Sequence, residues 1–233
     1  VGAIRRLSYV VYTSETNAFL AQLPLIQEKV VDILRSSPAD LVHAEVYLCM
    51  RVFLCRFASQ HLTGFWPIIL TEMVRILAQA KVDLPADKSD RLQLVFSVVK
   101  LADFLITLQT DDFQIHQWLL ITDTPDATNP ASSYMADSLL DCLAKFVSEC
   151  QRELVFDAND SLERAQQRRP LLQMSSVATI STLQPFFATA SRAFYQCDFH
   201  ATLDWDNINA CLLHDLFAVS YTHLRAHETR GNL

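Results

Sequence analysis

Glycine is nearly missing from this sequence, and its scarcity restricts the possible folds more than any other feature. The 233 residues contain three glycines, and only Gly64 lies away from the two ends. Average usage of about 7% would give roughly 16. The phosphate-binding motifs GxGxxG and GxxxxGKS/T therefore cannot be built, and β-sandwiches or barrels would lack their Gly-rich turns. The scarcity disfavours nucleotide-binding α/β folds and predicts an all-α protein.

Apolar residues recur at spacings of three and four along most of the chain, which is typical of amphipathic helices. We expect helices over residues 16–35, 40–57, 66–81, 91–108, 134–156 and 204–217. A short segment over 113–121 and a loop over 122–133 lie between them. Pro67 suits the first turn of its helix, where no N–H is needed. Ser89 or Asp90 can cap the helix that starts at 91.

The helix expected over 40–57 is apolar almost all round. Its charged residues are only Asp40, Glu45, Arg51 and Arg56. A helix of this kind must be buried by neighbours on several sides. The pattern therefore places it at the centre of a helical assembly.

Residues 171–191 carry no charge and are long enough to cross a bilayer. Their many Gln, Ser and Thr residues and the interruption at Pro185 argue against a membrane span. The apolar residues step by three and four at Ile180, Leu183, Phe187, Ala190 and Phe194. This stripe covers about two heptads, which favours packing within a helical stack over an oligomeric zipper.

Antiparallel helices joined by short loops indicate a stacked helical array. Helix pairs follow one another along the chain, but the sequence contains no repeating motif of the TPR or ankyrin type. We expect a segment of a HEAT-like α-solenoid, with a closed helical bundle as the alternative.

The charge balance and the cysteines limit the classes of partner and compartment. Nineteen basic against 26 acidic residues give a formal net charge of -7, opposite to the balance of a nucleic-acid binder. Six cysteines without a CxxC pair lie mostly among apolar residues, which indicates a reducing cytosol. The sequence begins at Val1 without a recognisable leader, so we expect a fragment.

The last residues are expected to be foreign to the fold. Residues 219–229, VSYTHLRAHET, match one reading frame of a common transposase-type sequencing adapter. We therefore assign residues 1–217 to one helical region and 218–233 to a non-native, disordered tail.

No candidate for catalysis or metal binding emerges from the motifs. Cys197-x-x-His200 with Asp204 is the only cluster with ligand-like spacing, and it lacks the second half of a zinc site. His43 and Glu45 are two positions apart in a helix and so face apart. We expect no enzyme, no cofactor, no metal and no small-molecule substrate.

Two groups of residues are candidates for contacts with partners. Arg164, Arg168 and Arg169 form a basic cluster that could contact anionic headgroups at roughly 1 kcal/mol per charge; the alternative is a solvated helix end. Phe65 and Trp66 precede a helix and could anchor a protein partner; the alternative is that they are core residues.

Residues 44–77, AEVYLCMRVFLCRFASQHLTGFWPIILTEMVRIL, resemble the C-terminal region of the Dopey family of large eukaryotic trafficking proteins. Further stretches agree in order: residues 23–35, 112–123, 168–174 (RRPLLQM) and 211–217 (CLLHDLF). The Trp-Pro helix start within HLTGFWP is the most specific of these. The resemblance extends over nearly all of residues 1–217.

The resemblance implies a cytoplasmic scaffold that is peripheral on Golgi and endosomal membranes. It implies action with a large Sec7-related partner and with phospholipid flippases, in traffic between endosomes and the trans-Golgi. Our leading hypothesis is a non-catalytic scaffold that works through protein–protein contacts. The alternative is a peripheral module that contacts anionic lipids through its basic helix end.

Overall fold

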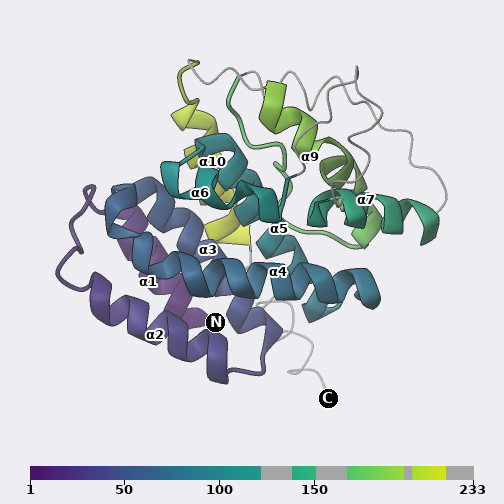
Figure 1. The fold of residues 1–233 in the computed structure, drawn as a ribbon. Helices are drawn as coiled ribbons and strands as arrows, with labels where there is room; N and C mark the ends of the chain where they lie inside the picture. Colours follow the sequence, from purple (N-terminus) through teal and green to yellow (C-terminus); the bar gives the residue numbers. More distant parts are fainter. Residues whose placement is uncertain (122–137, 151–166, 197–200, 219–233) are drawn as a thin grey trace, which may run out of the picture.

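A computed structural model of the chain describes residues 1–121, 138–150, 167–196 and 201–218. Within these residues every regular element is a helix (Figure 1). The α-helices are α1 Gly2–Thr13, α2 Leu23–Ser36, α3 Asp40–Arg56, α4 Trp66–Val82, α5 Asp90–Leu108, α6 Asp111–His116, α7 Leu139–Cys150, α9 Gln184–Gln196 and α10 Trp205–Ala218. Short 3-10 turns lie at η1 Ser59–His61, η2 Thr63–Phe65, η3 Gln117–Leu119 and η5 Ile180–Leu183. The prediction of an all-α protein is confirmed.

Helices α3 and α5 form the centre of the fold. Every residue from His43 to Leu54 in α3 is buried, as is every residue from Val98 to Leu108 in α5. Helices α1, α2 and α10 contact α3, while α4 and α9 contact α5, and α7 packs on both α4 and α9. The expectation that the apolar helix over 40–57 lies inside the assembly is therefore confirmed.

The two ends of the described chain meet. Helix α10 packs against α1 and against the central α3, although most of the sequence separates α10 from both. In a solenoid each repeat contacts only its neighbours along the chain. The sequence left two arrangements open, a HEAT-like solenoid and a closed helical bundle. The contacts of α10 with α1 and α3 are those of a closed bundle.

The predicted helix over 16–35 is wrong at its start, and α1 was not predicted. Helix α2 begins at Leu23 with Pro24 in its first turn, because proline cannot sit in a helix interior without losing a hydrogen bond. Asn17 has a positive φ of 64° and donates its N–H to the carbonyl of Arg56. Its side chain accepts the N–H of Ala58, so this turn is held against the end of α3.

The predicted helix over 134–156 is wrong at Ser138, which is described and not helical, since α7 begins at Leu139. The other predicted boundaries agree with the structure where it describes them. Ser89 caps α5 by accepting the N–H of Leu92 at 3.1 Å, and Asp204 accepts the N–H of Asn207 at 3.0 Å at the start of α10. All five residues of the predicted apolar stripe over 180–194 are buried. The loop over 122–133, the flanks of the helix over 134–156 and the tail from 219 lie outside the described residues.

Among the described helices, none is by itself both long and apolar enough to span a membrane. Helix α5 and the segment Asp111–Leu119 meet the length and composition criteria only together, as a pair bent by 115°.

Candidate functional site

The two aromatic residues proposed as partner anchors lie in the core. Phe65 is fully buried and packs edge-on against Phe53, with ring centroids 5.8 Å apart. Trp66 is 4% exposed and its indole Nε1 donates to a carboxylate oxygen of Asp112 at 3.1 Å. Neither side chain is available on the surface, so the sequence-based choice of anchors is corrected to the alternative core assignment.

The two described arginines of the basic cluster make contacts within the fold, and Arg164 lies outside the described residues. Arg168 donates to the backbone carbonyls of Thr107, Leu108 and Ala201 at 3.1 to 3.3 Å. It thereby satisfies carbonyls at the C-terminal end of α5, which have no partner within the helix. Arg169 forms an ion pair with Asp204, with 2.5 Å between Nε and Oδ2.

A non-helical segment, residues 168–178, lies along α5, and we call it the strap. Its backbone has no helix of its own to satisfy its polar groups, so side chains of α5 do so. The carboxylate of Asp103 accepts the N–H of Leu171 at 2.9 Å and that of Leu172 at 2.8 Å. Asp103 is fully buried. A buried charge on the central helix therefore holds the first part of the strap.

Two further side chains continue this attachment towards the N-terminal end of α5. The Nζ of Lys100 donates to the carbonyl of Met174 at 2.7 Å. The Nε2 of Gln93 donates to the carbonyl of Val177 at 2.9 Å. Later residues of the strap therefore contact earlier residues of α5, so the strap runs antiparallel to the helix.

A buried ionic cluster joins the central helices to α10. Lys100 on α5 donates to both carboxylate oxygens of Asp215, at 2.7 and 2.6 Å. Arg51 on α3 also donates to that carboxylate through Nη1. The three side chains are 2 to 6% exposed. Two buried cations thus share one buried carboxylate, and Arg51 also lies 5.4 Å from the ring centroid of Phe104.

A second ion pair brings α1 to the same region. Arg5 donates from Nε to a carboxylate oxygen of Glu45 at 2.8 Å, and from Nη2 to the other oxygen. Its Nη1 lies 3.4 Å from the backbone carbonyls of Asp215 and Leu216. Glu45 therefore pairs with α1, and not with its sequence neighbour His43, as the helical spacing predicts.

Burial and charge shift the titration of these groups in different directions. Burial raises the pKa of Asp103 to about 6, although the N–H groups of Leu172 and Leu171 oppose the shift. Burial, together with the nearby charge of Arg51, lowers the pKa of Lys100. Although burial opposes it, the two neighbouring cations hold the pKa of Asp215 below its usual range. Asp215 is therefore ionised at neutral pH.

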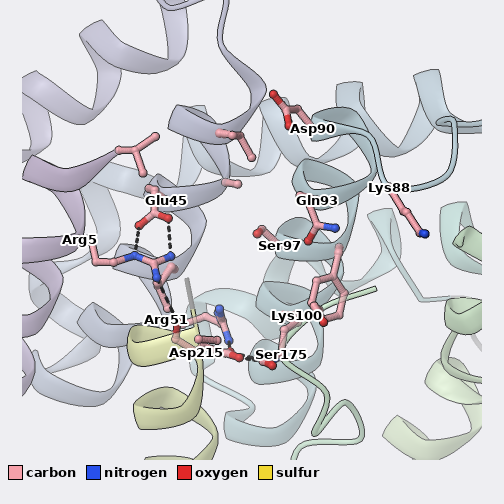
Figure 2. A pocket seen from close by; sticks show the side chains of 17 residues that line it. Arg5, Glu45, Arg51, Lys88, Asp90, Gln93, Ser97, Lys100, Ser175 and Asp215 are labelled. Atoms are coloured by element: carbon pink, nitrogen blue, oxygen red, sulfur yellow. Dashed lines mark hydrogen bonds and ion pairs between the residues drawn. The ribbon is translucent and has the colours of Figure 1, made fainter. Parts of the chain in front are cut away.

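A cavity of about 550 Å³ lies above this cluster, between α1, α3, α5, α10 and the strap. Figure 2 shows Arg5 and Glu45 on one side, Gln93 and Ser97 on the other, and Arg51 and Asp215 at the lower end. The polar side chains around it that carry donors include Arg5, Arg51, Lys88, Ser97, Lys100 and Ser175.

The described residues contain no group of three or more His, Cys, Asp or Glu side chains that could hold a metal ion. Cys197 and His200 lie outside the described residues, and Asp204 caps α10 and pairs with Arg169. Burial raises the pKa of the Cys49 and Cys55 thiols to about 12. Neither thiol is therefore activated as a nucleophile.

A family model described as DOP1 C-terminal matches residues 1–200. The chain belongs to this DOP1 C-terminal family. Protein DOP1B of Mus musculus is 28% identical over 225 residues, which cover 82% of this chain and 10% of that protein. Protein pad-1 of Caenorhabditis elegans is 31% identical over 160 residues, 63% of this chain and 7% of that protein.

Protein dop1 of Emericella nidulans is 31% identical over 145 residues, which cover 59% of this chain and 8% of that protein. The chain spans about a tenth or less of the length of these curated relatives. No solved structure matches it.

Three of the stretches that carry the Dopey resemblance meet around the ionic cluster. Residues 44–77 supply Glu45 and Arg51, and residues 211–217 supply Asp215. The stretch RRPLLQM forms the first part of the strap. Stretches far apart in the sequence are therefore brought together around one set of buried charges.

The cluster itself was missed by sequence analysis, although a signal for it exists. Arg51, Lys100 and Asp103 each interrupt a long apolar run. A charged residue in the middle of a helix that is buried all round must be paired. The sequence thus marks two members of the cluster, Arg51 and Lys100, together with the neighbouring Asp103, but the partner of each one is distant along the chain.

Proposed function

We propose that this chain is a non-catalytic scaffold module in protein traffic between endosomes and the trans-Golgi. Membership of the DOP1 C-terminal family is the observation that carries the proposal. Its partners would be a large Sec7-related scaffold and a phospholipid flippase, and its location the cytoplasmic face of Golgi and endosomal membranes. The chain would act through protein–protein contacts and would convert no substrate.

An exposed aromatic face supports contacts of this kind. Tyr9 on α1 is 44% exposed and Phe217 on α10 is 53% exposed, with their ring centroids 5.8 Å apart. Leu213, one turn before Phe217, is 37% exposed. We call these three residues the α1–α10 face. Clustered exposed aromatic residues are frequent anchors of binding energy at protein interfaces.

The proposal is tested by capturing partners with the tagged chain. We expect the chain to retain purified Sec7-related scaffold, and the double variant Tyr9→Ala with Phe217→Ala to lose most of it. Leu25→Ala on α2, at a position that is 59% exposed, is the matched control and should retain the scaffold. Failure of the unaltered, folded chain to retain either the scaffold or the flippase would contradict the proposed function. If the double variant and Leu25→Ala instead retain the Sec7-related scaffold equally, the α1–α10 face is not the surface that binds it.

The alternative hypothesis is lipid contact through Arg164, Arg168 and Arg169. The contacts of Arg168 with backbone carbonyls and of Arg169 with Asp204 do not favour it. Flotation of the chain with anionic vesicles, compared with an Arg168→Ala, Arg169→Ala variant, distinguishes the two hypotheses.

A further inference from the structure

The segment that follows the central helix α5 presents one exposed face (Figure 1). Gln109, with a φ of 51°, ends α5, and the chain then bends by 115° into residues 111–119. The exposed residues of this segment are Asp111, Gln114, Ile115 and Trp118. Their positions, i, i+3, i+4 and i+7, lie on one face of a helix. We call these four residues the α6–η3 face.

The opposite side of the same segment is fixed to the rest of the fold. Phe113 is 2% exposed and packs edge-on against Phe194 of α9, with ring centroids 6.3 Å apart. The carboxylate of Asp112 accepts the indole N–H of Trp66 on α4 at 3.1 Å. The α6–η3 face is therefore held in place before any partner binds, so binding would cost little conformational entropy on this side.

Two large apolar side chains stand on the α6–η3 face. Ile115 is 67% exposed and Trp118 is 68% exposed. A single exposed apolar residue is ordinary, but here two lie three positions apart on a fixed surface. Tryptophan is enriched among the residues that carry binding energy at protein interfaces, and its ring also attracts arginine and lysine side chains. The face thus suits a partner segment that offers both apolar and cationic side chains.

The sequence around the α6–η3 face is strongly acidic. Residues 101–144 contain seven aspartates and neither lysine nor arginine. The other residues contain 19 basic and 19 acidic side chains, so this stretch accounts for the whole net charge of -7. Asp111 places one of these charges on the face itself. Charge complementarity therefore favours a positively charged partner, and it disfavours an anionic membrane surface.

We propose that the α6–η3 face binds a basic, apolar segment of a partner protein, of the kind that borders membrane-spanning helices on their cytoplasmic side. Such segments carry an excess of lysine and arginine. Ile115 and Trp118 would contact the apolar side chains of the segment, and Asp111 a cation. The inference rests on the proposed function, in which a phospholipid flippase is one partner. It assigns the flippase to this face and leaves the α1–α10 face to the Sec7-related scaffold.

The test is the affinity of the tagged chain for purified, detergent-solubilised flippase. The double variant Ile115→Ala with Trp118→Ala should weaken binding by about tenfold or more, and Asp111→Lys by about threefold. Val82→Ala, at a position that is 84% exposed at the end of α4, is the apolar control. Asp87→Lys, at an exposed position between α4 and α5, is the charge control. Both controls should bind as the wild type does, and circular dichroism should show the same helix content in all variants.

The possible results separate this inference from the scaffold function. Equal affinity of the wild type and the double variant overturns the inference, while the bound flippase still supports the proposed function. No binding of the flippase by the wild type also overturns it, and retention of the Sec7-related scaffold then decides on the proposed function by itself. Flotation with phosphatidylcholine vesicles tests a bilayer as the occupant. Flotation of the wild type that the double variant loses would show that the face binds lipid, and this would overturn the assignment to a protein segment.

Discussion

Lys100 on α5 donates to both carboxylate oxygens of Asp215 on α10, a residue 115 positions later in the chain. Arg51 on α3 shares that carboxylate across 164 positions. A buried ion pair adds little net stability compared with apolar packing, but removing one partner leaves an uncompensated charge. We infer that the cluster mainly sets where α10 docks on the central pair of helices.

Asp215→Asn should destabilise the fold strongly. The amide keeps the shape of the side chain but leaves the charges of Lys100 and Arg51 buried without a counter-ion, at a cost of about 3–5 kcal/mol. The free energy of unfolding in urea measures this cost. Asp206→Asn, at an exposed position in the first turn of α10, is the control and should cost at most about 1 kcal/mol. A loss at Asp215 no larger than that of the control would contradict the role of the cluster.

The stability of the chain should depend on pH through Asp103. Its pKa rises from an ordinary 3.8 to about 6 on folding, so between these values the folded state binds more protons than the unfolded state. The contribution of Asp103 to stability therefore falls as the pH rises through this window, and the penalty is complete above about pH 6. The full change is roughly 3 kcal/mol.

This dependence is isolated by comparison with Asp103→Asn, which cannot titrate. The wild type should become more stable relative to Asp103→Asn, as measured by the free energy of unfolding, when the pH falls from 7 to about 4. The pKa of Asp215 is lowered from its ordinary value of 3.8. Its protonation therefore reduces stability only below about pH 3.8, which lies outside this window. Parallel pH profiles for the two proteins would show that Asp103 keeps an ordinary pKa.

Arg168→Ala should cost about 1–2 kcal/mol of stability. The change removes the donor from the carbonyls of Thr107 and Leu108 at the end of α5 and from Ala201, and hydrogen bonds to charged donors are worth more than neutral ones. Thermal unfolding measures the loss. Arg169→Ala removes a partly exposed ion pair with Asp204 and should cost less than about 1 kcal/mol. The reverse order of the two variants would contradict the assignment of Arg168 as a cap.

Trp66→Ala should destabilise the fold by about 3–5 kcal/mol, since it creates a core cavity and leaves Asp112 without its indole donor. Urea denaturation followed by circular dichroism measures this. Trp118→Ala, at a position that is 68% exposed, should stay within about 0.5 kcal/mol of wild type. If Trp66→Ala changes the free energy of unfolding only slightly but abolishes partner binding, Trp66 contacts a partner and is not a core residue.

Much of the secondary structure was accessible from the sequence alone, because a helix is a local structure. Its hydrogen bonds join residues four apart, and its caps lie within three residues of its start. The apolar periodicity therefore predicted α3, α4, α5 and α10 closely, and Ser89 and Asp204 marked two of their starts. The scarcity of glycine also predicted the all-α class. Phosphate-binding loops and the turns of β-sandwiches and barrels need glycine locally, so a chain with three glycines cannot form many of them.

The tertiary structure alone decided which distant groups meet. The sequence marks Arg51, Lys100 and Asp103 as charges in apolar helices, but it does not contain their partners locally. Only the closure of α10 onto α3 brings Asp215 to two of them, and only the path of the strap brings the N–H groups of Leu171 and Leu172 to Asp103. The physical reason is that a buried charge can be satisfied by any suitable partner that folding places beside it.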